Sequence, residues 1–303
     1  MSRWFRFDLP GGVVYKSRLI SSDWSRWVAK RARPFVRNRW MRYLEHTNTQ
    51  SDKPVVEAGG PIVSLTTFEP RWSRVFYTLE SIGSGTMRPS RLVLWVAPSV
   101  MNLGFPEQLI RLQRRGLEIR SCEDIGPHKK YYPLIDSFET PQAFVTCDDD
   151  VLYPLDWLQR LVSASEVHPH CVVAHRARQI QLEVSGEVCP YATWPHAVDD
   201  VPDFRKFAIG IGGVLYPPAM SAALRDAGEG FRTVCPRADD VWLKAVSLRA
   251  GLQVSQVSSK FLFLIDVPGM RESGLAKVNV SGGGNDAQIS STFSELDLRQ
   301  LLN

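Results

Sequence analysis

The chain of 303 residues carries a formal net charge of +4, and 44% of its residues are hydrophobic and 22% charged. These proportions are typical of a soluble globular protein, so they exclude a largely disordered chain, and the length allows one large domain or two small ones. No stretch approaches the roughly 18 consecutive apolar residues that a membrane-spanning helix requires. Asp8 and the turn Pro10-Gly11-Gly12 interrupt any early apolar core, so we expect no cleavable signal peptide.

The distribution of charge and the cysteines narrow the class further. Residues 1–43 contain eleven Lys or Arg and two acidic residues, a local balance of +9, so the rest of the chain carries about −5. The five cysteines form no CxxC pair, a spacing that fits neither a disulfide framework nor a zinc site. We therefore expect reduced thiols and a cytoplasmic protein with one basic end.

The basic N-terminal region, residues 1–58, is expected to be an extension with a linker, followed by one α/β domain at residues 59–303. Residues 23–46 contain no Gly and only Pro34 as a helix breaker, which predicts one or two helices. Residues 47–60 are mostly polar and end in a Gly pair, which predicts a linker.

Four tryptophans, Trp4, Trp24, Trp27 and Trp40, interleave with the cations of this extension. Aromatic rings and cations together are typical of segments that lie on anionic lipid, so residues 1–45 are a candidate for peripheral contact with the inner face of the plasma membrane. A nucleic-acid surface and a helical arm packed on the domain are the alternatives. Because no nucleic-acid motif occurs elsewhere in the chain, nucleic acid is not an expected partner.

From residue 61 onward, short apolar strands alternate with helical segments. The alternation predicts an α/β fold, with a mostly parallel, Rossmann-like sheet, helices on both faces and sites at the carboxyl ends of strands. Strands are expected at residues 62–65, 91–96, 117–121, 143–147, 171–174, 213–216, 252–257 and 261–265, with helices at 74–81, 106–115, 239–250 and 295–302. Beyond residue 269 a Gly- and Ser-rich segment predicts a loop.

Three adjacent carboxylates, Asp148, Asp149 and Asp150, follow the apolar strand at residues 143–147. Neighbouring carboxylates repel one another, and burying them without a counter-charge is costly. A divalent cation removes that penalty, and oxygen ligands of this type suit Mg²⁺ or Mn²⁺ when phosphate oxygens complete the shell. A solvated acidic turn is the alternative, but the apolar sequence on both sides favours the metal site.

At these residues the chain resembles the GT-A class of glycosyltransferases, in particular family 2-like bacterial enzymes for surface polysaccharides. The triplet at 148–150 is similar to their DxD motif, residues 62–68 (IVSLTTF) resemble their first strand and nucleotide loop, and residues 236–243 (PRADDVWL) resemble their acidic motif beside the acceptor. The resemblance covers about residues 61–288. It implies a GT-A-like fold and transfer of a sugar from a nucleotide-sugar donor to a glycan or lipid-linked acceptor, with a divalent cation, Mn²⁺ or Mg²⁺, as cofactor.

The resemblance also implies roles for individual residues. Asp150 would ligate the metal together with Asp148, and Asp240, with Asp239 beside it, would be the general base of an inverting reaction. Taken alone, Asp239 and Asp240 also fit a helix N-terminus, where acids stabilise the helix dipole. Adjacent lysines before the triplet could neutralise phosphate oxygens or lie in an exposed basic turn. The donor side would comprise Thr66, Thr67, Phe68, Arg71, Lys129, Lys130, Asp148 and Asp149.

A third set of residues is expected near the acceptor and the sugar. Two glycines would allow close backbone approach to a sugar or form a tight turn, and two aromatic rings could stack on a sugar or pack in the core. A strand-end histidine, followed by an arginine, could point into the crevice or be structural. Asn285 and Asp286 could belong to a lid or to a disordered tail. The expected members of this set are His175, Arg176, Tyr191, Trp194, Gly212 and Gly213.

Two other functions fit the same residues. A metal-dependent nucleotidyltransferase would use the same triplet, but it would be expected to have a glycine-rich, basic loop where residues 66–70 read TTFEP. A non-catalytic glycan-binding or scaffold protein would not need both the triplet and the pair Asp239-Asp240. The resemblance to family 2 enzymes implies an acidic residue at the end of the second strand that reads the nucleotide base. Here that strand ends in LWVAP at residues 94–98, without a carboxylate, so the identity of the base stays open.

Overall fold

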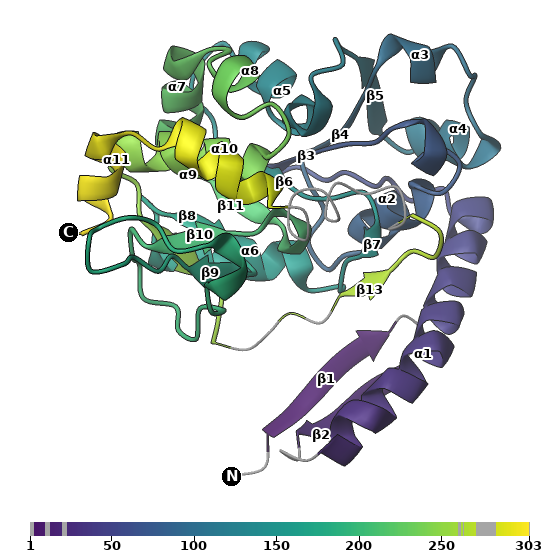
Figure 1. Ribbon diagram of the computed structural model, residues 1–303. Helices are drawn as coiled ribbons and strands as arrows, with labels where there is room; N and C mark the ends of the chain where they lie inside the picture. Colours follow the sequence, from purple (N-terminus) through teal and green to yellow (C-terminus); the bar gives the residue numbers. More distant parts are fainter. Residues whose placement is uncertain are drawn as a thin grey trace.

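The structure, a computed structural model, describes the backbone of residues 3–9, 13–19 and 23–32 and the complete residues 33–259, 262, 264–270 and 283–302. The strands of its main sheet are β3 (Ile62–Thr66), β4 (Arg91–Val96), β5 (Leu117–Ser121), β6 (Phe144–Thr146), β8 (Val172–Ala174), β11 (Val214–Tyr216) and β12 (Val254–Gln256). They form a seven-stranded sheet in the order β12-β8-β11-β6-β3-β4-β5 (Figure 1).

Most strand pairs of this sheet are parallel. β3 runs parallel to β4 and β6, β4 to β5, and β8 to β12, whereas β11 is antiparallel to both of its neighbours, β6 and β8. The predicted α/β class with a mostly parallel sheet is therefore confirmed. Each of the seven strands overlaps a segment where a strand was expected, but the reversed direction of β11 is not visible in the sequence.

Helices cover both faces of the sheet. Val63 and Leu65 of β3 belong to one hydrophobic cluster and Ile62 to another, and because successive strand residues point to opposite faces, the two clusters lie on opposite sides. The first cluster is covered by α1 (Asp23–Gln50), α2 (Phe76–Gly83), α3 (Pro98–Met101), α4 (Glu107–Arg114) and α6 (Trp157–Val167). The second is covered by α5 (Tyr132–Asp136), α7 (Pro218–Ala227), α8 (Phe231–Val234), α9 (Asp239–Arg249), α10 (Gly284–Thr292) and α11 (Glu295–Gln300).

The N-terminal extension begins with a hairpin that the sequence pattern does not predict. β1 (Arg3–Leu9) and β2 (Val13–Leu19) pair antiparallel, and the hairpin lies beside the N-terminal part of α1, away from the main sheet (Figure 1). Further along α1, Val36, Trp40 and Leu44 are buried at intervals of four residues, which places them on one helix face against the domain. No helix among the described residues is both long and apolar enough to cross a membrane.

The segment expected as a linker is largely fixed to the domain. α1 continues to Gln50, four residues beyond the expected helix end at residue 46. Val55 is fully buried, and its N–H donates a hydrogen bond of 2.8 Å to Arg115 O, just before β5. One buried valine and one backbone hydrogen bond thus hold the otherwise polar segment 47–60 against the domain.

The C-terminal region differs from expectation in two places. Among the described residues of the strand expected at 261–265, Ile265 lies in β13 (Ile265–Asp266), which pairs with β7 (Val151–Leu152) directly after the aspartates. The loop expected beyond residue 269 lies largely outside the described residues. Asn285 and Asp286, for which a lid and a disordered tail were the alternatives, lie in the first turn of α10.

Candidate active site

Two loops and one helix start meet where β6 ends. Thr146 of β6 lies opposite Val214 of the antiparallel β11, so the aspartates that follow β6 lie beside η4 (Gly210–Gly212), the short helix that precedes β11. The first turn of α9 joins them through Asp239 and Asp240. The triplet, the glycine turn and the later acidic pair, far apart in sequence, therefore form one cluster.

Lys130 is the cation at the centre of this cluster. Its Nζ lies 3.0 Å from Asp148 Oδ1 and 2.7 Å from Asp239 Oδ2, and its side chain is only 6% exposed. Burial alone would lower the pKa of Lys130, but the neighbouring carboxylates raise that pKa well above its usual value, so the side chain stays protonated. Ser64 of β3 donates a hydrogen bond of 2.7 Å to Lys130 O. Lys130 thus ties the triplet to the start of α9.

Arg71, at the end of η1 (Glu69–Arg71), neutralises the other two carboxylates of the triplet. Its guanidinium forms ion pairs with Asp149 and, at 3.1 Å, with Asp150. Thr67 donates a hydrogen bond of 2.5 Å to Asp149. Burial nevertheless raises the pKa of Asp149 above its usual value, against the lowering effect of Arg71. Two residues predicted to bind the donor therefore hold the triplet itself.

The rest of the predicted donor loop is more open. Thr66 and Phe68 are partly exposed, and Thr66 Oγ1 donates a hydrogen bond of 2.9 Å to Trp95 O in the neighbouring strand. The Arg71 guanidinium carbon lies 5.1 Å from the centre of the Phe68 ring. A ligand at this edge of the sheet would meet Thr66 and Phe68 before the buried residues.

Asp240 has the properties of a general base. Its Oδ2 accepts a hydrogen bond of 3.1 Å from Gly210 N. Burial and the charge of Asp239 raise the pKa of Asp240 to about 7, although Lys130 acts in the opposite direction. Burial also raises the pKa of Asp239. A carboxylate that titrates near neutral pH can be ionised at rest and still accept a proton readily from a hydroxyl group.

The three neighbouring carboxylates of the triplet do not converge on one point. Asp148 faces Lys130, whereas Asp149 and Asp150 both face Arg71. The counter-charge that the sequence led us to expect from a divalent cation is thus supplied, in part, by two protein side chains. Sequence spacing does not reveal this, because both cations come from other segments of the chain.

The cluster nevertheless fits a divalent cation that arrives with a diphosphate. Among the described residues, no three His, Cys, Asp or Glu side chains form a ready metal cage, but Mg²⁺ is usually held by one or two carboxylates together with substrate phosphates. Asp148 suits that use, because its side chain is 34% exposed, whereas Asp150 is 12% exposed. The cluster brings five aspartates together, and the ion pairs of the triplet and of Asp239 are made with Lys130 and Arg71.

Two buried aromatic residues join the triplet to the glycine turn. Tyr153 OH lies 3.0 Å from Asp148 N and 3.1 Å from Ile211 O. Trp157 Nε1 donates a hydrogen bond of 2.7 Å to Gly212 O. In the sequence both residues look like apolar flanks of the triplet, and the only signal of another role is that the polar tips of buried Tyr and Trp need partners.

His175 and the two glycines serve the packing of this region. His175 Nε2 lies 2.9 Å from Trp157 O, and burial lowers the pKa of His175 to about 3, so the ring is neutral. A Cβ on Gly212 would lie 3.0 Å from Arg176 Cγ, and a Cβ on Gly213, whose φ is +88°, would overlap the Trp157 ring. The glycines therefore make room for protein side chains.

Three other predicted residues form their ion pair or ring contacts with residues outside the five clustered aspartates and their two cations. Lys129 forms an ion pair with Asp124. Tyr191 and Trp194 are buried beside Phe207, with ring centres 5.7 and 5.4 Å from its ring. This arrangement matches the core-packing alternative for the two aromatic rings.

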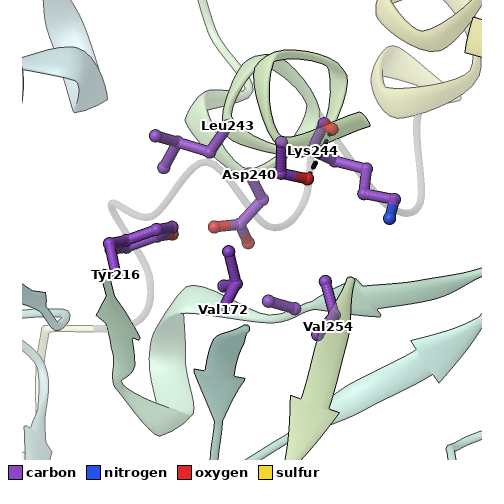
Figure 2. A pocket seen from close by; sticks show the side chains of 8 residues that line it. Val172, Tyr216, Asp240, Leu243, Lys244 and Val254 are labelled. Atoms are coloured by element: carbon purple, nitrogen blue, oxygen red, sulfur yellow. Dashed lines mark hydrogen bonds between the residues drawn. The ribbon is translucent and has the colours of Figure 1, made fainter. Parts of the chain in front are cut away.

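A small cavity of about 10 Å³ lies between α9 and the sheet, on one side of Asp240. Figure 2 shows the Asp240 carboxylate directed towards Tyr216 and Val172, whereas the amino group of Lys244 points away from it. Lys244 Nζ instead donates a hydrogen bond of 2.6 Å to Phe204 O. The cavity is at the lower limit for one water molecule, so it is too small to admit a sugar.

A wider hollow of about 620 Å³ lies at the opposite end of the strands, between α1 and the loop after α2. Two of the cations that line it, Arg88 and Arg115, are paired with Glu57 and Glu80. None of the five clustered aspartates lines it. The groups that could carry a reaction are in the acidic cluster.

The sequence matches no protein-family model and no curated protein. Among solved structures, the chain is similar to S. aureus TarS 1–349, with 12% identity, 80% of this chain and 71% of that chain covered, and a TM-score of 0.46. It is also similar to S. aureus TarS 1–349 in complex with UDP (12% identity, 80% and 71% covered, TM-score 0.44) and to S. aureus TarS (14% identity, 80% and 42% covered, TM-score 0.45). Identities and TM-scores this low do not by themselves assign an activity.

Proposed function

We propose that this protein is a metal-dependent glycosyltransferase that moves a sugar from a nucleotide-sugar donor to a hydroxyl of a glycan or lipid-linked acceptor. One observation carries the proposal. Asp240, with a pKa of about 7, shares a buried cluster with Asp148, the most exposed aspartate of the triplet, and Lys130 lies between the two sides. A base and a separate acidic site for a cation and diphosphate are the two parts that a metal-dependent, inverting glycosyl transfer uses.

The proposed reaction is a direct displacement with inversion. Asp240 takes the proton of the acceptor hydroxyl while the hydroxyl oxygen forms a bond to the anomeric carbon of the donor sugar. The bond from that carbon to the oxygen of the donor phosphate breaks at the same time, and its electron pair stays on the diphosphate. Asp148, with Asp150 behind it, would hold Mn²⁺ or Mg²⁺. The ion, when bound, would neutralise the leaving diphosphate. Thr66 and Phe68, at the open edge, would contact the nucleotide.

The basic extension would bring the enzyme to its acceptor. Residues 1–43 carry a balance of +9, and electrostatic attraction to anionic lipid adds about 1 kcal/mol for each Lys or Arg near the surface. Phe35 of α1 is 68% exposed, whereas Val36 beside it is buried against the domain. A lipid-linked acceptor at the inner face of the plasma membrane would suit this distribution.

The test is a thermal-shift screen of UDP, GDP, CDP and TDP, each with and without Mn²⁺, followed by transfer assays with sugars of the nucleotide that stabilises the protein. A ligand at one hundred times its Kd stabilises the fold by about 2.7 kcal/mol. We expect Asp148→Asn to lose the Mn²⁺-dependent part of this shift. Asp240→Asn should keep the shift and lose turnover.

Three results would overturn the proposal. Full transfer activity in Asp240→Asn would remove its base. Stabilisation by nucleoside triphosphates but by no diphosphate would favour a nucleotidyltransferase. Stabilisation by glycans alone would favour a binding module.

A further inference from the structure

We propose that Tyr153 and Trp157 are positioning residues that clamp the η4 turn and thereby hold Gly210 N–H against the Asp240 carboxylate. The inference rests on the proposed role of Asp240 as the base. No hydrogen bond or ion pair joins either aromatic side chain to Asp240, so both act through the turn.

The hydroxyl oxygen of Tyr153 contacts both the loop after β6 and the turn before β11. Its side chain is fully buried, and its hydroxyl oxygen lies 3.0 Å from Asp148 N, 3.2 Å from Asp148 O and 3.1 Å from Ile211 O. A phenolic hydroxyl has one proton and two lone pairs, so it accepts the Asp148 N–H and shares its proton between the carbonyls of Asp148 and Ile211. The loop after β6 and the turn before β11 are therefore linked through a single oxygen.

Trp157 holds the next carbonyl of the same turn. Its Nε1 donates to Gly212 O at 2.7 Å, and its ring lies where a side chain on Gly213 would be. The ring itself packs against two others, because the Tyr153 ring centre is 4.4 Å and the His175 ring centre 6.4 Å from its own. Trp157 therefore enters the clamp already oriented.

The turn transmits this constraint to the base. Two successive carbonyls, of Ile211 and Gly212, are held by the clamp, while the N–H of Gly210, at the start of η4, donates to Asp240 at 3.1 Å. That hydrogen bond favours the ionised form of Asp240 and fixes one of its oxygens. The clamp variants change none of the titratable groups around Asp240, which are Lys130, Asp148, Tyr191, Tyr216, Asp239 and Lys244.

The decisive variant is Tyr153→Phe, which removes only the hydroxyl. We expect kcat to fall about tenfold to a hundredfold with a smaller change in donor KM, because displacement of a catalytic group by about 1 Å can cost a hundredfold in rate. The acid limb of the pH–rate profile should also move to higher pH, since Asp240 loses support for its charge. Trp157→Phe should act in the same direction, and the two effects should not be additive.

The matched control is Tyr77→Phe. Tyr77 is a buried tyrosine on α2 whose hydroxyl donates to Glu45 on α1, away from the acidic cluster. Its loss should lower the thermal midpoint without changing kcat or the pH profile. A Tyr153→Phe enzyme whose kcat and acid limb match those of the wild type, or of the Tyr77→Phe control, overturns the clamp.

A second measurement separates this inference from the proposed function. If the wild-type protein transfers no sugar, the proposed function fails, and the pKa of Asp240 can still be measured by carboxyl-carbon NMR in both proteins. The clamp requires a higher Asp240 pKa in Tyr153→Phe than in the wild type. An unchanged value refutes it, whatever the activity.

Discussion

Gly210→Ala tests the geometry of the cluster with one added methyl group. A Cβ at this position would lie 2.9 Å from Asp240 Oδ1 and 3.1 Å from Lys130 Nζ. Ordinary contact begins near 3.4 Å, so the carboxylate must move by about half an ångström. If a displacement of about 1 Å costs a hundredfold in rate, this shift predicts a loss of about tenfold in kcat.

The same change should hardly affect stability. Gly210 has no positive φ, so alanine fits its backbone, and replacing glycine at a compatible site stabilises a protein by about 0.4–1 kcal/mol through the unfolded chain. This gain offsets part of the local crowding. We therefore expect kcat, measured as sugar transfer at saturating donor, to fall while the thermal midpoint stays within about 2–4 °C of the wild type, the shift that 1 kcal/mol produces in a chain of this size.

Gly251→Ala is the matched control with the opposite pattern. Gly251 follows α9 with φ of +67° and open space around its Cβ position, so alanine there is strained by about 1–2 kcal/mol without touching the cluster. It should lose stability and keep kcat. If Gly210→Ala retained wild-type kcat, or lost stability as Gly251→Ala does, the proposed packing around Asp240 would be refuted.

Two further predictions follow from charge. Asp240 has a pKa of about 7 in the fold, against 3.8 for a free side chain. Between about pH 4 and pH 7 the folded state therefore keeps a proton that the unfolded chain loses. The contribution of Asp240 to the stability of the fold falls as the pH rises through this range. Asp240→Asn should therefore have a higher free energy of unfolding than the wild type at pH 8, measured in urea, and the difference should shrink towards pH 5. A difference that does not depend on pH would contradict the raised pKa. Deleting residues 1–32 removes seven of the eleven cations before residue 44 but keeps Arg33, whose guanidinium pairs with Asp266 at 2.9 Å, and the buried Trp40. Because each cation near the surface contributes about 1 kcal/mol, binding to vesicles that contain phosphatidylserine should weaken by more than about a hundredfold. Binding to neutral vesicles is the control. Unchanged binding to the anionic vesicles would rule out the membrane role.

The strands were predictable because their signal is local. The run RLVLWV at β4 is apolar on both faces, and such a run indicates a strand covered on both sides wherever it occurs. The aspartates after β6 could be placed at a strand end for the same reason. The direction of β11 could not, because antiparallel and parallel strands differ in their partners and not in their own residues.

The features of the site that the sequence does not predict are contacts between segments far apart in the chain. Arg71 and Asp149 are 78 residues apart, and nothing in either segment marks the other as its partner. The hydroxyl of Tyr153 bonds to Ile211, 58 residues away, although the sequence shows only an aromatic residue after three aspartates. The sequence therefore marks these acids as candidates, while their counter-ions and the residues that support them are visible only in the fold.

The state of the acids separates an enzyme from a scaffold. Burial raises the pKa of both Asp239 and Asp240, which means that at neutral pH their ionised forms destabilise the fold. In a protein that only binds or supports, a neutral side chain in place of Asp240 would raise stability without loss of function, whereas Asp239 is also the ion-pair partner of Lys130. An enzyme must accept that destabilisation, since the base has to be ionised beside the hydroxyl it deprotonates. A rise in stability and a loss of transfer in the same Asp240→Asn protein is therefore the combination that an enzyme requires and a scaffold does not.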